Sequence, residues 1–158
     1  MSNISDFVQI AQQRAHVYKK CSPEQALVYV CEDLTDENIG SLSLNSLSAS
    51  QWIEKVCEQE DIDTPEVHVL PGRTHIRGSS LLENNSICLY GNTAHASTLI
   101  HEIAHLMSDG HSHGILFRDE MVRLSRAHIS IDYAAMLHAL YMGCQLQVSP
   151  WEASAIRR

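Results

Sequence analysis

The stretch STLIHEIAHLMSDGHSHGILF, residues 97–117, holds four of the ten histidines of the chain. His101 and His105 lie four positions apart. Each residue of a helix advances by about 100°, so both imidazoles would project from one helical face. Apolar residues occupy most of the remaining positions, which is typical of a buried amphipathic helix. The stretch therefore predicts a helix over about Ala94–Ser108 that presents two histidines together.

Two imidazoles held one turn apart can bind a single metal ion. Glu102 follows the first of them, which is the HExxH arrangement of zinc peptidases, in which the glutamate acts as a general base. Zinc in such a site polarises a carbonyl group, lowers the pKa of its bound water to about 7, and usually has three protein ligands and one open position. Beyond His101 and His105, the third ligand is either His111 or His113.

The rest of the chain predicts an α+β fold, in which a small, mainly antiparallel sheet is packed by several helices. Apolar residues recur at helical spacing in five further segments, which are residues 4–18, 23–34, 49–59, 113–127 and 132–143. Three short segments have the alternation or β-permissive composition of strands, namely residues 66–70, 73–78 and 86–91. The polar segment 35–50 is expected to be a connection or an irregular strand. No internal repeat or boundary appears, and we expect one domain, 1–158.

Small polar residues before the apolar patterns predict where the helices begin, because their side chains can accept hydrogen bonds from the first backbone N–H groups. Ser22, followed by proline, is the clearest of these predicted N-caps. The other predicted caps are Ser48, Asn92 or Thr93, and Ser112.

Composition limits the classes of partner. Lys and Arg number 11 against 19 Asp and Glu, for a formal charge of −8, which argues against non-specific binding of nucleic acid. The five cysteines are scattered and form no CxxC pair, so we expect free thiols in a reducing compartment. The first residues lack the layout of a signal peptide, and no apolar run reaches about 18 residues. These features predict a cytoplasmic protein with no membrane partner.

The motif HEIAH, with HG and a phenylalanine after it, resembles small metallohydrolases of the minimal zincin type, akin to SprT-like metallopeptidases. The segments QQRAHVY and ALYMG extend the resemblance loosely over most of the chain. The resemblance implies a zincin-like fold with an HExxH active-site helix, a Zn²⁺ cofactor and a peptide or protein substrate. It also implies zinc ligands at His101, His105 and His113, with Glu102 catalytic.

His111 gives a second interpretation, because HEIAHLMSDGH has the H-x3-H-x5-H spacing of the YbeY-type endoribonucleases. Two features favour the zincin interpretation. Glu102 is placed to activate water, and His113 is the histidine that GILF follows. A third possibility is a non-catalytic protein that keeps the zincin scaffold for interactions. A three-histidine site also accepts divalent ions other than zinc.

Other residues are candidates for supporting roles. Tyr141, in the segment ALYMG, is either an oxyanion-stabilising hydroxyl or a core tyrosine. Asp109, Asp119 and Glu120 are either solvated or orient a ligand imidazole. We also expect an extended substrate to add to an exposed edge strand, with SICLYG, residues 86–91, as the candidate.

Overall fold

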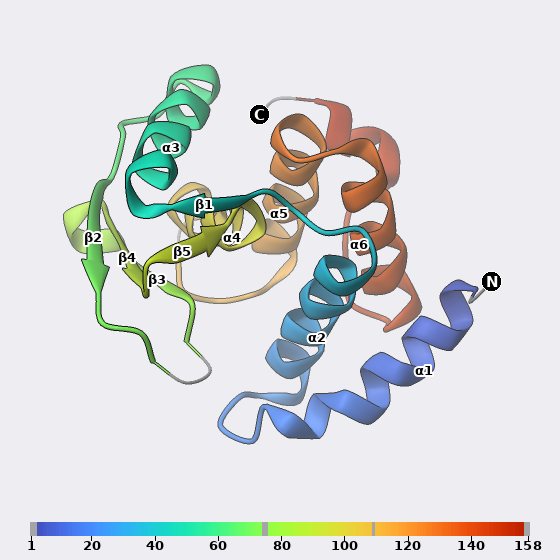
Figure 1. Ribbon diagram of the computed structural model, residues 1–158. Helices are drawn as coiled ribbons and strands as arrows, with labels where there is room; N and C mark the ends of the chain where they lie inside the picture. The colour runs from blue at the N-terminus through green and yellow to red at the C-terminus, as the bar shows by residue number, and fades with distance from the viewer. Residues whose placement is uncertain (1–2, 74–75, 109, 157–158) are drawn as a thin grey trace. The chain divides into compact units, whose positions relative to one another are not determined.

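The computed structural model describes residues 3–73, 76–108 and 110–156. It is α+β, as predicted, with six α-helices and five short strands among these residues. The contacts divide the chain into two compact units, Met1–Gly40 with Ser112–Arg158, and Ser41–His111 (Figure 1). That the chain acts as the one domain 1–158 stays a prediction. The five cysteines are free thiols. In the described part of the chain, we find no helix with the length and apolarity needed to cross a membrane.

The first unit is helical. Its elements are α1 (Ile4–Arg14), the 3-10 turn η1 (Ala15–Val17), α2 (Pro23–Asn38), α5 (Ile115–His128), α6 (Ile131–Gly143) and the 3-10 turn η3 (Trp151–Ala155). Helix α6 packs against both α2 and α5, and α1 packs against α2 and α6 (Figure 1). Fully buried side chains from three of these helices include Leu34, Phe117, Leu124, Tyr133 and Leu137.

The N-cap predicted at Ser22 is confirmed, because its hydroxyl accepts a hydrogen bond from the N–H of Gln25 at 3.1 Å. Helix α2 runs four residues further than predicted. Two of the polar residues that suggested a connection, Thr35 and Asp36, form hydrogen bonds within the helical unit. Thr35 is fully buried and donates to the carbonyl of Cys31 at 2.8 Å, and Tyr133 donates to Asp36 at 3.1 Å. The burial of Thr35 and the tertiary hydrogen bond from Tyr133 to Asp36 therefore favour a longer helix than composition alone predicts.

The cap predicted at Ser112 is wrong. Helix α5 begins at Ile115, with Gly114 as the N-cap and no side-chain hydrogen bond. Two residues more than predicted therefore stay outside the helix, and His113 is one of them.

Gly143 permits the close crossing of α1 and α6. A Cβ atom added to Gly143 would lie 2.3 Å from Cγ2 of Val8. Helix propensity alone predicts that Gly143→Ala stabilises the fold by about 1 kcal/mol, whereas overpacking costs about 1–3 kcal/mol. We therefore expect a net loss of up to about 2 kcal/mol in the free energy of unfolding, measured by urea denaturation. Val8→Ala should remove most of the clash in the double variant, and a single variant more stable than wild type would contradict this packing.

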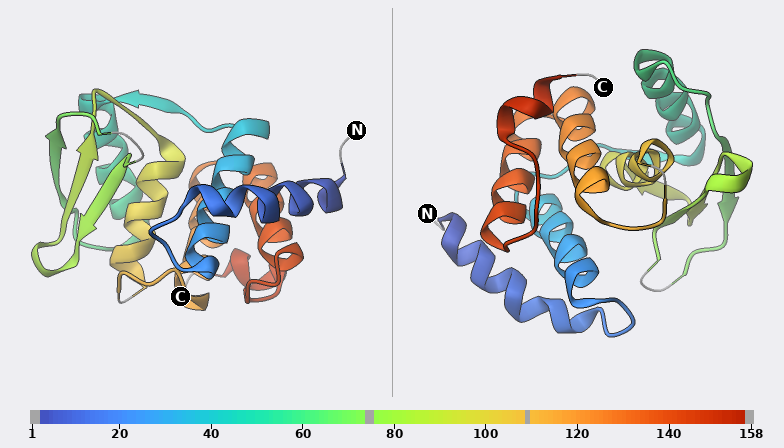
Figure 2. Two further views of the ribbon diagram at one scale, coloured as in Figure 1. Left: turned by 90° about the horizontal axis from the view of Figure 1, so that it is seen from below. Right: turned by 180° about the vertical axis from the view of Figure 1, so that it is seen from behind.

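The second unit contains the strands. Its elements are β1 (Ser43–Asn45), α3 (Ser46–Glu60), β2 (Glu66–Leu70), β3 (Gly78–Leu81), the 3-10 turn η2 (Leu82–Asn84), β4 (Ser86–Tyr90), β5 (Thr93–His95) and α4 (Ala96–Met107). Strands β1 and β5 form an antiparallel pair, and the other three form a sheet of order β2-β4-β3. Helix α4 packs against β3, and the left view of Figure 2 shows α4 beside this sheet.

The three-stranded sheet is mixed, although two of the three strand pairings among the described residues are antiparallel, in line with the predicted mainly antiparallel arrangement. Strand β4 pairs antiparallel with β3 but parallel with β2. Successive strands do reverse direction, but β4 inserts between the two strands that precede it. Its central residues Ile87, Cys88 and Leu89 are all buried, as is usual for a strand covered on both faces. The prediction that SICLYG is an exposed edge strand is therefore wrong, and β2 and β3 are the edges.

Helix α4 begins later than predicted, and neither Asn92 nor Thr93 is its cap. Residues Thr93–His95 instead pair with β1. Ser41 and Leu42, which lie just before β1, also supply hydrogen-bond acceptors for the start of α4. The N–H of Ala96 donates to the carbonyl of Leu42 at 2.8 Å, and the N–H of Ser97 donates to the hydroxyl of Ser41 at 3.2 Å. These contacts are long-range, so the local sequence gives no sign of them.

The cap predicted at Ser48 is also wrong. Helix α3 begins three residues earlier than expected. Asn45 is its N-cap, with its side-chain oxygen accepting from the N–H of Ser48 at 2.9 Å. Asparagine is as good an N-cap as serine, so the sequence just before the apolar stripe does not decide between Asn45 and Ser48 as the cap.

Candidate metal site

Helix α4 carries the HEIAH sequence and is buried on nearly every side. His101, Glu102 and His105 all lie in it, with 9%, 4% and 4% of their surface exposed. Helical spacing brings the two imidazoles to the same face, and their ring centroids lie 4.9 Å apart. The apolar residues that predicted the helix thus hold two histidines in the interior of the protein.

The tautomer of His105 is set by the turn that follows α4. Its Nδ1 lies 3.0 Å from the carbonyl oxygen of Gly110. A carbonyl oxygen only accepts, so Nδ1 carries the proton and the lone pair is on Nε2. Burial, together with the neighbouring His101, lowers the pKa of His105 to about 4. The ring is therefore neutral near pH 7, which is the form that binds metals.

Glu102 lies against the beginning of β3. A Cβ atom added to Gly78 would lie 3.0 Å from Oε1 of Glu102 and 3.2 Å from Cγ2 of Thr98. Only glycine lets this edge strand approach α4 so closely without moving the carboxylate. The position of the Glu102 side chain therefore depends on a residue from another element.

His113 lies between α4 and α5, in the loop just before the Gly114 cap. Its ring packs edge-on against Tyr29 and Phe117, with centroid distances of 5.0 Å and 4.7 Å. Its carbonyl oxygen accepts a hydrogen bond from Nη1 of Arg118 at 2.8 Å. Both the ring and the backbone of His113 are thus held by residues of the helical unit.

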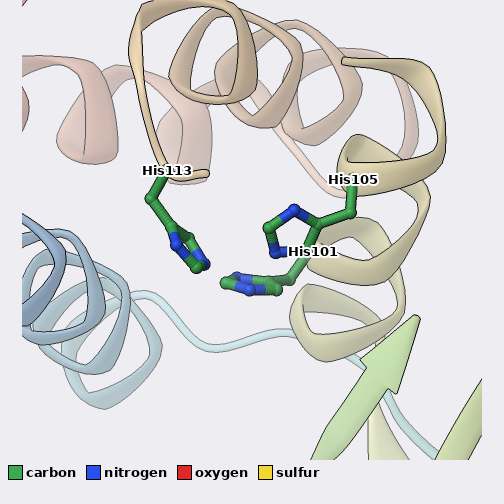
Figure 3. A group of neighbouring side chains, drawn as sticks. All are labelled: His101, His105 and His113. Carbon is green, nitrogen blue, oxygen red and sulfur yellow. The ribbon is translucent and has the colours of Figure 1, made fainter. Parts of the chain in front are cut away.

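Three of the histidines form one group, as Figure 3 shows. One ring nitrogen from each of His101, His105 and His113 lies within 4.8 Å of the others, close enough to share a metal ion. His111 is exposed and does not belong to this group, although its ring centroid lies 6.3 Å from that of His105. Of the two candidates for a third ligand, His113 is the one that belongs to this group of three ring nitrogens.

Tyr141 is fully buried in α6, and its hydroxyl donates to Oε1 of Glu32 at 3.3 Å. Burial and the nearby Glu32 carboxylate raise the pKa of Tyr141 well above its usual value, so the phenol stays protonated. These contacts describe a core tyrosine with a satisfied hydroxyl. An oxyanion-stabilising role for it stays a prediction.

Two acidic residues near the motif, Asp119 and Glu120, are buried and not solvated. Asp119 is buried and accepts hydrogen bonds from the N–H and the hydroxyl of Ser149, at 2.7 Å and 2.6 Å. Glu120 is buried and pairs with Arg123 at 2.8 Å. These contacts tie the C-terminal segment to α5 and pair two charges within that helix. Asp109 lies outside the described residues.

Sequence reasoning missed two residues beside the candidate site. Gly78 falls in a β-permissive segment, and a glycine within a strand is a known sign of close backbone approach, so a signal was present. Arg118 stands in the charged run RDE, and nothing in the sequence distinguishes it from a surface arginine. Comparison with protein families, curated proteins and solved structures finds no match for this chain.

Proposed function

We propose that this protein is a zinc-dependent metallohydrolase, and specifically a peptidase of minimal zincin type. The observation that carries the proposal is the group of three histidine nitrogens within 4.8 Å of one another, two of them on the helix that also presents Glu102. Three protein ligands and one open position are typical of catalytic rather than structural zinc sites.

The donor set suits zinc. All three potential ligands are imidazoles, and zinc readily accepts imidazole nitrogen. The hydrogen bond from His105 to the Gly110 carbonyl is the kind of outer contact that fixes the tautomer of a metal-binding histidine. When bound, zinc would polarise a substrate carbonyl and make water acidic enough to react at neutral pH.

Residues of the chain would then carry out the proton transfers of the reaction. Glu102 would take a proton from the attacking water and pass it to the leaving amine, as general base and then general acid. Its carboxylate is buried, so little bulk water competes for that proton. His101, His105 and His113 would hold the metal while the reaction proceeds.

Strand β3 is the best place for an extended substrate. It pairs only with β4, which leaves its other edge without a strand partner among the described residues. It also packs against α4 and begins at Gly78, beside Glu102. A peptide that adds to this edge would form main-chain hydrogen bonds and bring its backbone toward the general base. This placement replaces the one predicted on SICLYG.

The test is metal content and hydrolysis on the same sample. Protein purified without added metal should contain one zinc per chain by elemental analysis and should cleave members of a peptide library, detected by mass spectrometry. A chelator should stop cleavage and added zinc should restore it. Bound zinc with every peptide intact would favour the interaction protein, cleavage of RNA instead would favour the nuclease, and absence of bound metal would refute the proposal.

Gly78→Ala tests the packing behind Glu102. The added methyl group should push the carboxylate by a few tenths of an ångström, and small displacements of catalytic groups are costly. We expect kcat/KM for a cleaved peptide to fall by about 10- to 100-fold while the zinc content is unchanged. Gly72→Ala is the control, because the one described atom that a Cβ there would meet is the Cα of Gly91, at an ordinary 3.8 Å. Equal activities of the two variants would contradict the role of Gly78.

A further inference from the structure

Arg118 is an unusually buried cation. It lies in the first turn of α5 with only 2% of its surface exposed. Its ion-pair partner Glu24 has a side chain that is 59% exposed. Burying a charge is costly unless hydrogen bonds and an ion pair offset the loss of hydration, so the hydrogen bonds of this guanidinium are expected to have a structural role.

The guanidinium joins three segments of the helical unit. Nη1 donates to Oε1 of Glu24 on α2 at 2.6 Å and to the carbonyl oxygen of His113 at 2.8 Å. Nε donates to the carbonyl oxygen of Gln147, after α6, at 2.7 Å. In addition, the N–H of Arg118 donates to the carbonyl of Gly114 at 3.0 Å. The side chain of Arg118 thus holds the backbone at His113, whereas the bond to Gly114 is an ordinary main-chain bond of the helix start.

The backbone at His113 is not part of a helix or strand. Helix α5 begins without a side-chain cap, and His113 is outside the regular hydrogen bonding of either helix. The edge-on contacts with Tyr29 and Phe117 confine the imidazole ring, but they do not fix the backbone from which it projects. A rigid guanidinium fork can fix that backbone, because its N–H groups point in defined directions.

We propose that Arg118 is a positioning residue that fixes His113 in the orientation needed to bind the metal. The inference rests on the proposed function only in that the three histidines bind a metal ion. Arg118 acts through the His113 carbonyl, so it need not touch the metal or the substrate. Residues that orient a ligand in this way typically change metal affinity by about 10- to 100-fold.

The test compares Arg118→Lys with Arg123→Lys. Arg123 lies in the same helix, is also buried and pairs with Glu120, so its variant is a matched loss of a buried guanidinium. Lysine at position 118 can keep the charge beside Glu24, but it cannot reproduce the guanidinium fork. We expect Arg118→Lys to weaken zinc binding by about 10- to 100-fold in a chelator competition, and Arg123→Lys to change it less than about threefold.

Two further readouts separate positioning from general stability. The d–d absorption of bound Co²⁺ should change in Arg118→Lys and not in Arg123→Lys, while both variants should lose stability in urea without metal. If Arg118→Lys does not fold, Glu24→Gln removes the exposed partner and leaves the guanidinium in place. That variant should weaken zinc binding at least threefold and alter the Co²⁺ spectrum.

The outcomes distinguish this inference from the proposed function. Wild-type zinc affinity and an unchanged Co²⁺ spectrum in Arg118→Lys would overturn the inference and leave the peptidase proposal intact. Zinc binding that depends on Arg118, in a protein that cleaves no peptide, would support the inference and reject the peptidase. A wild-type protein that binds neither metal would overturn both.

Discussion

Replacing Glu102 with glutamine should lower kcat/KM for peptide hydrolysis by about 10³-fold, within the range that general acid–base catalysis contributes. Glutamine has nearly the shape of glutamate, which matters because the side chain is buried against Gly78. Its amide cannot take a proton from water at neutral pH. The loss should therefore appear in turnover and not in packing.

Zinc content separates this effect from damage to the site. None of the three histidines is altered, so Glu102→Gln should retain one zinc per chain. Glu60→Gln is a matched control, because Glu60 is also a buried carboxylate of the same unit, with 8% of its surface exposed, but lies on α3. We expect that control to keep wild-type activity. A Glu102→Gln enzyme with more than a tenth of wild-type kcat/KM would contradict the assignment of the general base.

The helices were predictable where the apolar pattern is long. The stripe at Phe117, Met121 and Leu124 predicted α5, and all three side chains are buried. Their starts were less predictable, because several small polar residues precede each stripe and each could be a cap. Ser22 is followed by a proline, which suits only the first position of a helix, and it is the cap that was predicted correctly. Ser112 had no such neighbour.

The order of the strands could not be read from their residues. The run Ile87, Cys88 and Leu89 indicates a strand buried on both faces, and that is a property of a central strand. We predicted an edge strand there because of its position just before the histidine helix. Chain order does not determine sheet order when a later strand inserts between two earlier ones, as β4 does.

The candidate site was predictable where it depends on helical periodicity. His101 and His105 share a face because they are four residues apart in one helix. The contacts of Gly78 with Glu102 and of Arg118 with His113 depend on which elements pack together, so a single sequence does not specify them. The sequence thus indicates the chemistry of the site, whereas the residues that orient it come from tertiary packing.

Substitution of His113 should have a much larger effect on zinc binding than substitution of His111. His113→Ala should weaken zinc binding by more than about 100-fold, because loss of a direct ligand should exceed the 10- to 100-fold cost of losing an outer contact. His111→Ala should change it by less than about threefold, because His111 is exposed and outside the group of three nitrogens. Competition with a chromogenic chelator measures both.

His111 and His113 lie in the same short loop, so each variant is a control for the other. Each removes one imidazole within two residues of the other, but only His113 packs against Tyr29 and Phe117. Unfolding in urea without metal should show what part of the His113→Ala effect is lost packing. If His111→Ala alone released the zinc, the third ligand would come from the exposed side of the loop, with the H-x3-H-x5-H spacing of the endoribonucleases. Hydrolysis of structured RNA would then be the activity to measure in place of peptide cleavage.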